Sequence, residues 1–264
     1  MFSVDYYSLV SLPIEIYSGR HYLSNASGFF VNYENGLFFV SNWHVFSGRD
    51  ANTGQPLDSR MLIPDRLDFA LHGKELGSTA GVTSLTIRSG DKNLWLQHQA
   101  GQEYDIACTR IDGVPEHALI SVAFDYREKS KLKMTKEIGS DCFVVGHPVR
   151  GKISEILPVW KRATIATEFH VPWRGKDCFL VDTTTSDGMS GSPVYLRKSG
   201  SVKFEDSEIR TIASDPINEF IGVYSGRIKR AAEGILDLGI VWKKDLLEEM
   251  VMNPVPGDHV IKSR

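Results

Sequence analysis

The sequence predicts an all-β fold of two units of similar size followed by one helix, and three observations lead to it. Short segments rich in Phe, Val and Ile recur along residues 28–111 and again along 141–225, each bounded by turn residues. A polar, lysine-rich stretch at 127–133 separates the two groups and is typical of a solvated linker. Only residues 243–252 carry apolar side chains at helical spacing, and Pro254 follows as a stop signal.

The first group of strands begins with a hairpin. Residues 28–31 and 37–40 flank Asn35-Gly36, a pair of residues that favours a tight turn between antiparallel strands. Two more strands are expected at 82–88 and 106–111, where β-branched residues are frequent. The second group of strands is expected at 141–148, 178–181, 193–196 and 220–225.

The composition is that of an ordinary globular protein. Of 264 residues, 42% are apolar and 24% are charged, which is enough to bury a large core without cross-links. The net charge of -3 gives no reason to expect a nucleic-acid or membrane partner.

Neither a cofactor nor a metal is expected, because the chain has no H-E-x-x-H motif and no paired-cysteine spacing. Cys108, Cys142 and Cys178 form an odd and sparse set that predicts free, buried thiols. Residues 1–6 lack the pattern of a signal peptide, and no apolar run has transmembrane length. These features favour a cytoplasmic location.

The most informative segment is residues 186–193, a turn in which Gly188 and Gly191 flank Ser190. A serine hydroxyl is a poor nucleophile unless a base removes its proton. A histidine, His44, lies upstream at the end of an expected strand, and Asp105 lies between the two, directly before another strand. The order His, Asp, Ser along the chain is that of the chymotrypsin-type arrangement.

Five segments resemble the chymotrypsin-like (trypsin-type) serine peptidases, in particular the bacterial trypsin-like peptidase domains related to the HtrA proteases. They are 42–45 (similar to TNxHV), 105–107 (DIAV), 188–193 (GxSGGP), 141–148 (the strand that opens the second barrel) and 222–225 (the strand that pairs with substrate). The resemblance as a whole is taken to cover residues 28 to 242, a wider range than these five segments.

This resemblance implies two six-stranded antiparallel β-barrels, a chymotrypsin-like double barrel, with a C-terminal helix. The domain boundaries that follow are an N-terminal barrel at 1–125, a linker at 126–138, a second barrel at 139–242, and a helix with a tail at 243–264.

The resemblance also implies the roles of the three residues. Ser190 would be the nucleophile, His44 the general base, and Asp105 the acid that orients the imidazole. The backbone N–H groups of Gly188 and Ser190 would form the oxyanion hole.

A specificity pocket is implied with Thr184 at its floor and Tyr224, Ser225 and Gly226 on its walls. Since Thr184 is not a carboxylate, we expect an uncharged substrate side chain there rather than Lys or Arg. Ser225 is also expected to hydrogen-bond Asp105.

One other residue competes for the role of the acid. Asp68, in the segment 67–71, also matches a DxAL pattern, but its neighbours Pro64, Asp65 and Arg66 are typical of a turn, and this favours Asp105. His147, in Gly146-His147-Pro148, is interpreted as a turn residue.

Met189 departs from the trypsin-like zymogens, which have an aspartate before the serine that pairs with a newly cut N-terminus. Activation by such a cleavage is therefore not expected, and regulation would act through loop ordering or an activating protein partner. Ser192 stands where the family more often has glycine. No C-terminal stretch is long enough for a PDZ domain.

Two classes of function remain open from the sequence. The first is a serine endopeptidase that hydrolyses protein or peptide substrates through an acyl-enzyme on Ser190. The second is a catalytically silent peptide-binding or scaffold module on the same fold, because fold alone does not define function.

Overall fold

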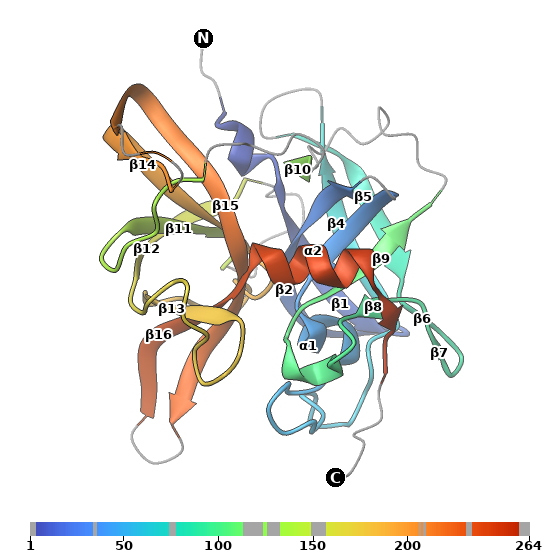
Figure 1. Ribbon diagram of the computed structural model, residues 1–264. Helices are drawn as coiled ribbons and strands as arrows, with labels where there is room; N and C mark the ends of the chain where they lie inside the picture. The colour runs from blue at the N-terminus through green and yellow to red at the C-terminus, as the bar shows by residue number, and fades with distance from the viewer. Residues whose placement is uncertain are drawn as a thin grey trace.

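The computed structural model describes residues 4–33, 36–73, 78–112, 124–125, 133–148, 157–205, 207, 210–230 and 234–258. The described chain is mostly β and forms two strand-rich units, with a short helix lying across the region where they meet (Figure 1). The all-β prediction with a C-terminal helix is confirmed at this level.

The first unit is a nine-stranded sheet with the order β17-β8-β9-β3-β2-β1-β4-β5, and β10 pairs with β2. Its strands are β1 (Ser11–Ser18), β2 (His21–Tyr33), β3 (Gly36–Ser41), β4 (Arg66–His72), β5 (Thr79–Thr86), β8 (Leu96–Gln97), β9 (Ala107–Ile111), β10 (Phe124–Asp125) and β17 (Val255–Pro256). The helices and the small hairpin of this region are η1 (Tyr6–Ser8), α1 (Trp43–Ser47), β6 (Arg88–Ser89), β7 (Lys92–Asn93) and η2 (Gly101–Glu103).

The predicted hairpin is present, since β2 and β3 pair antiparallel from Phe29–Val40 to Tyr33–Gly36. Asn35 itself lies outside the described residues. The segment predicted at 106–111 is β9, and the one predicted at 82–88 is divided between β5 and β6.

The first sheet differs from the expected six-stranded barrel, because the hydrogen-bonded path of its described strands stays open. One edge, β5, is solvent-exposed along most of its length. The other edge consists of the two-residue strands β8 and β17. An exposed edge strand and two-residue edge strands offer few backbone hydrogen bonds with which to close the sheet.

The second unit is a closed barrel of six strands in the order β11-β12-β13-β16-β15-β14, as the resemblance implied. Its strands are β11 (Asp141–Gly146), β12 (Val159–Ile165), β13 (Cys178–Asp182), β14 (Pro193–Lys203), β15 (Arg210–Arg230) and β16 (Gly234–Lys243). The sequence did not predict β12, whose Lys161 and Arg162 interrupt the apolar pattern. It also did not predict β16 as a separate strand.

The helix α2 (Lys244–Met252) joins the two units. It buries Leu246, Leu247, Met250 and Val251 in a core that also contains β2 and β3 residues and barrel residues such as Tyr195 and Phe220. Beyond the helix the chain returns to the first unit, where β17 pairs with β8. The two units therefore share this apolar cluster, and each unit also has a cluster of its own.

The predicted linker at 126–138 is only partly described, because residues 126–132 lie outside the described ranges. The three cysteines are free and buried, as predicted. Within the described ranges, no helix has both the length and the apolar character needed to cross a membrane.

Candidate active site

His44 lies in α1, a five-residue helix that directly follows β3. The neighbours of His44 on this helix, Trp43, Val45 and Phe46, are buried in the first unit, whereas 21% of the His44 side chain is exposed. The buried Asn42 side chain precedes the helix and donates a 2.8 Å hydrogen bond to the carbonyl oxygen of Asp105. The apolar packing of α1 thus leaves the imidazole of His44 partly exposed.

Asp105 lies two residues before β9, and its carboxylate accepts three hydrogen bonds. Oδ1 accepts from the backbone N–H of His44 at 2.8 Å. Oδ2 lies 2.7 Å from Nδ1 of His44 and 2.5 Å from Oγ of Ser225, which donates to it. The bond that was predicted between Ser225 and Asp105 is therefore present.

The electrostatics of this group follow from its partners. Burial alone would raise the pKa of Asp105, but the attraction of His44 and the hydrogen bonds from His44 and Ser225 lower the pKa below its usual range. An ionised Asp105 holds a proton on Nδ1 of His44, which leaves Nε2 as the basic nitrogen of the ring.

The Ser190 turn is shaped by two glycines with positive φ, Gly188 at 92° and Gly191 at 83°. A Cβ atom at Gly188 would lie 2.3 Å from the His147 carbonyl oxygen, and one at Gly191 would lie 2.2 Å from the Ser27 carbonyl oxygen. Neither position admits a larger residue, so both the backbone angle and the close packing require glycine.

Ser27, on β2, fixes this turn from the first unit. Its N–H donates to the Ser190 carbonyl at 2.8 Å, and its Oγ donates to the Gly188 carbonyl at 2.8 Å. The backbone of Tyr224, on β15, bonds the N–H of Gly191 and the carbonyl of Ser192 from the other side, both at 2.9 Å. Sequence analysis missed Ser27, because a single serine inside an apolar strand carries no local signal.

Met189 is 1% exposed and packs in the core of the second barrel. It anchors the turn through apolar contacts at the position where trypsin-like zymogens carry an aspartate. Among the described residues, no acceptor bonds the N–H groups of Gly188 and Ser190.

His44 and Ser190 line the same cavity, which has a volume of about 350 Å³. The other residues around it come from β1, β2, α1 and the loop between α1 and β4. Thr184, Tyr224, Ser225 and Gly226 do not line this cavity.

The residues predicted for the specificity pocket are spread over different environments. Thr184 is exposed, and Gly226 has a φ of 121°. Tyr224 is 1% exposed, and its hydroxyl lies 2.5 Å from Oγ1 of the buried Thr185. A Cβ atom at Gly239 would lie 2.4 Å from the Tyr224 ring. The ring thus fills the space between Thr185 and β16.

The rival acid, Asp68, is bonded elsewhere. It lies within β4, not in a turn as its neighbours suggested, and it accepts hydrogen bonds from Arg66 at 2.9 Å and Ser84 at 2.7 Å. His147 follows β11 and is buried, with Nε2 3.3 Å from the Ser11 carbonyl. Throughout the described ranges, no three His, Cys, Asp or Glu residues are grouped as metal ligands would be.

Comparison with known proteins identifies the family. The trypsin-like peptidase domain matches residues 26–202, a range that contains His44, Asp105 and Ser190. No curated protein matches the chain in sequence. The chain belongs to the trypsin-like peptidase domain family and is a serine endopeptidase by class.

Three solved structures are similar to the chain. An inactivated protease paralogue of the scabies mite has a TM-score of 0.50 at 13% identity, covering 95% of this chain and 96% of its own. A thermostable serine protease from an extremophilic microorganism has a TM-score of 0.48 at 12% identity, covering 90% and 93%. The protease Anisep from Arthrobacter nicotinovorans has a TM-score of 0.48 at 13% identity, covering 89% of each chain. At these identities the likeness concerns the fold alone.

Proposed function

We propose that the chain hydrolyses peptide bonds through an acyl-enzyme on Ser190, with His44 as general base and Asp105 as the orienting acid. The observation that carries this proposal is the His44–Asp105 pair, joined by bonds of 2.8 and 2.7 Å, in a cavity that Ser190 also lines. A buried acid that bonds Nδ1 of His44 makes Nε2 the basic nitrogen of the ring, which is the atom that takes the serine proton.

The reaction then has two halves. Ser190 Oγ attacks the substrate carbonyl while its proton passes to His44, and His44 returns that proton to the leaving amine. Water attacks the acyl-enzyme next, and His44 again receives and returns a proton. The N–H groups of Gly188 and Ser190 are the donors for the oxyanion in both halves.

The acyl half of the substrate is proposed to lie along β15 near Ser225 and Gly226. The family resemblance of residues 222–225 supports this placement. Gly226 has no side chain to cover the backbone there. The residue before the cleaved bond is expected to be uncharged, with the exposed Thr184 beside it.

The alternative is a silent peptide-binding module. One similar structure is itself an inactivated protease paralogue, so the fold can persist without catalysis. The intact bonding between His44 and Asp105 favours the enzyme, because a binding module gains nothing from an imidazole held in one tautomer.

A fluorophosphonate probe distinguishes the two functions. We expect the wild-type chain to be labelled and Ser190→Ala and His44→Ala to be unlabelled, with circular dichroism showing all three folded. The probe is used with and without cell lysate, so that a requirement for an activating partner shows as lysate-dependent labelling. Absence of labelling under every condition would favour the binding module.

A further inference from the structure

The segment that follows α2, residues 253–258, returns to the first unit and packs along residues 93–98. We call it the strap. Its strand, β17, pairs antiparallel with β8 (Figure 1). Next to the strand, the N–H of Gly257 donates to the carbonyl of Trp95 at 2.8 Å, and the side-chain amide of Asn93 donates to the carbonyl of Gly257 at 2.9 Å. The strap is therefore joined to the first unit by strand pairing and by two further hydrogen bonds.

Gly257 allows the strap to lie directly on the indole ring of Trp95. A Cβ atom at this glycine would lie between 2.4 and 2.5 Å from three atoms of that ring. The ring is 1% exposed and belongs to the core cluster of the first unit. Since a close-packed core leaves the ring little room to move, a side chain at position 257 would displace either the ring or the strap.

Trp95 also contacts α1, the helix that carries His44. The centroid of its ring lies 6.4 Å from that of Trp43, edge to face at 81°, and 5.8 Å from that of Phe46. Trp43 and Phe46 are both buried and lie on either side of His44 in a helix of five residues. A helix this short is stabilised by packing rather than by its own hydrogen bonds. The position of α1 therefore depends on the rings that pack against it.

Gln97 of β8 makes a second contact with this helix. Its Oε1 accepts a 2.8 Å hydrogen bond from Nε1 of Trp43, and both side chains are buried. A buried indole N–H without an acceptor costs free energy, so this bond favours one position of the Trp43 ring. The strand β8 has only two residues and pairs with β9 on one side and β17 on the other. The strap thus supplies one of the two pairings of the strand that carries Gln97.

The same stretch of chain leads to Asp105. His98 follows β8, and its Nε2 lies 3.3 Å from Oε1 of Glu249 on α2. Its Nδ1 accepts a 3.0 Å hydrogen bond from the N–H of Ala100, and its ring lies edge to face on Tyr104 with centroids 4.7 Å apart. Tyr104 directly precedes Asp105. The segment that ends in α2 and the strap therefore contacts the chain next to both members of the His44–Asp105 pair.

We propose that Trp95 and Gln97 are positioning residues for the proposed reaction, and that the strap holds them against α1. The imidazole of His44 is then kept in line with Asp105 and Ser190 by contacts made away from the reacting atoms. No residue of the strap lines the cavity at His44 and Ser190. The effect on turnover rests on the proposed function, but the support of α1 is a property of the fold that can be measured without turnover.

Gly257→Val tests the strap. The new side chain displaces Trp95 or the strap, so we expect kcat for an ester substrate to fall about tenfold or more, because a small misplacement of a catalytic group slows the reaction step. KM should change by less than about twofold, since the cavity is not touched. Met252→Val is the matched control. It introduces the same side chain at a position just before the strap that is 54% exposed, and it should keep both constants.

Gln97→Met tests the second contact. It removes the acceptor of Trp43 at nearly constant volume, and we expect kcat to fall about tenfold with little change in KM. Combined with Gly257→Val, the loss should be smaller than the product of the two single losses, because both substitutions act on the position of α1. Losses that multiply would show that the two residues act independently and would contradict the role of the strap.

Proton NMR reports the support of α1 without turnover. The proton on Nδ1 of His44, 2.7 Å from Oδ2 of Asp105, should give a resonance far downfield of the amide protons, because a short hydrogen bond to a carboxylate deshields it. The resonance should be present in the wild type and in Met252→Val. It should be absent in Asp105→Asn, which assigns it, and weakened or lost in Gly257→Val and Gln97→Met.

Circular dichroism at the temperature of measurement shows whether each variant is folded, and Gln97→Met provides the test if Gly257→Val does not fold. An unchanged resonance together with an unchanged kcat in the folded variants would overturn the proposal. A fall in both with native circular dichroism is the expected result.

The two proposals fail in distinguishable ways. If the wild-type chain forms no acyl-enzyme, but its downfield resonance is present and responds to Gly257→Val, the proposed function is wrong and the support of α1 by the strap stands. If the acyl-enzyme forms and neither kcat nor the resonance responds to the substitutions, only the role of the strap is wrong.

Discussion

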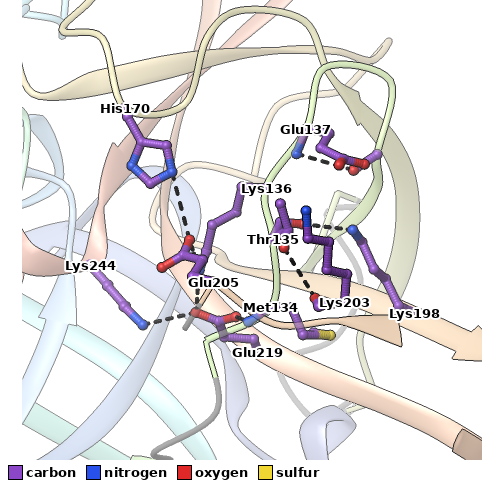
Figure 2. Close-up of polar contacts among 11 residues, drawn as sticks. Met134, Thr135, Lys136, Glu137, His170, Lys198, Lys203, Glu205, Glu219 and Lys244 are labelled. Atoms are coloured by element: carbon purple, nitrogen blue, oxygen red, sulfur yellow. Dashed lines mark hydrogen bonds and ion pairs between the residues drawn. The ribbon is translucent and has the colours of Figure 1, made fainter. Parts of the chain in front are cut away.

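Two buried clusters of charged groups in the described part of the chain differ in what surrounds them. Asp105 faces one titratable partner, His44, at the edge of an open cavity. In the second barrel, Lys136 is 2% exposed and pairs with Glu205 at 3.0 Å and Glu219 at 2.8 Å. Lys244 and His170 are the other partners of these glutamates, as Figure 2 shows. Nζ of Lys244 lies 3.0 Å from Oε1 of Glu219, and Nε2 of His170 lies 3.7 Å from Oε1 of Glu205.

Burial of charge therefore does not by itself mark a site of chemistry. Glu219 also accepts a 2.7 Å bond from the N–H of Met134, so the cluster ties residues 134–136 and the start of α2 to β15. None of these residues lines the cavity at Ser190. In the proposed mechanism the first cluster exchanges a proton with a substrate, whereas the contacts of the second cluster hold segments of the chain together.

The largest loss of activity is expected when the cluster of His44 and Asp105 is broken. Asp105→Asn should lower kcat about 10⁴-fold, because an amide no longer holds the proton on Nδ1 of His44. Ester hydrolysis measured at saturating substrate reports this loss. Asp68→Asn is the matched control. This variant should retain kcat, because the carboxylate of Asp68 bonds Arg66 and Ser84 rather than His44. If Asp68→Asn lost the activity and Asp105→Asn kept it, the acid would be misassigned.

Breaking the second cluster should affect stability instead. Lys136→Met leaves Glu205 and Glu219 without their shared cation, and this should cost about 3–5 kcal/mol of unfolding free energy. Urea denaturation measures the loss, and Ser190 labelling of the folded fraction should be unchanged. Adding Glu219→Gln, which keeps an acceptor for Met134, should recover part of the stability. A fall in labelling comparable to that of Asp105→Asn would contradict a purely structural role.

A third buried group, His147, makes the unfolding free energy depend on pH. Burial lowers its pKa to about 4, in spite of its bond to the Ser11 carbonyl. The unfolded chain takes up this proton near pH 6.5, so between pH 6.5 and 4 it binds more protons than the folded chain, and stability falls as the pH falls. The loss should approach about 3 kcal/mol at pH 4.

Urea denaturation between pH 4 and 8 tests this dependence. His147→Gln, which keeps a donor for the Ser11 carbonyl, should reduce the slope below pH 6.5. His72 is also buried with a lowered pKa, so some slope should remain. An unchanged slope in the variant would show that His147 does not carry the effect.

The smallest expected effect concerns the thiols. Burial raises the pKa of Cys142 to about 12 and of Cys178 to about 11, and it also raises the pKa of Cys108. Native protein at pH 8 should therefore resist iodoacetamide and keep its activity, while the urea-unfolded chain should react at every cysteine. Rapid inactivation of the native chain would point to a reactive thiol near the site.

Much of the candidate site was predictable, because its residues occupy short patterns at strand ends. His44, Asp105 and Ser190 each sit in such a segment, and the expected Ser225 bond also exists. Ser27 was not predictable, since its contacts depend on how β2 meets the Ser190 turn. The cavity that His44 and Ser190 line escaped prediction for a similar reason, because its lining combines residues of β1, β2 and α1 with a later loop.

The fold was predictable in its class and in the second barrel, but not in the open edge of the first sheet. The predicted linker at 126–138 contains Lys136, which is buried because Glu205 and Glu219, far along the chain, converge on it. A lysine-rich composition predicts solvated side chains. Whether a given lysine is solvated or buried depends on ion pairs with residues far along the chain.

In the proposed mechanism, the bond between Asp105 and His44 makes Ser190 nucleophilic. The most direct measurement is mass spectrometry of the chain quenched early in the hydrolysis of an activated ester. We predict one acyl group per chain on the peptide that contains Ser190, strongly reduced in Asp105→Asn and absent in His44→Ala. Acylation at another residue, or equal acylation of Ser190 in all three proteins, would contradict the account.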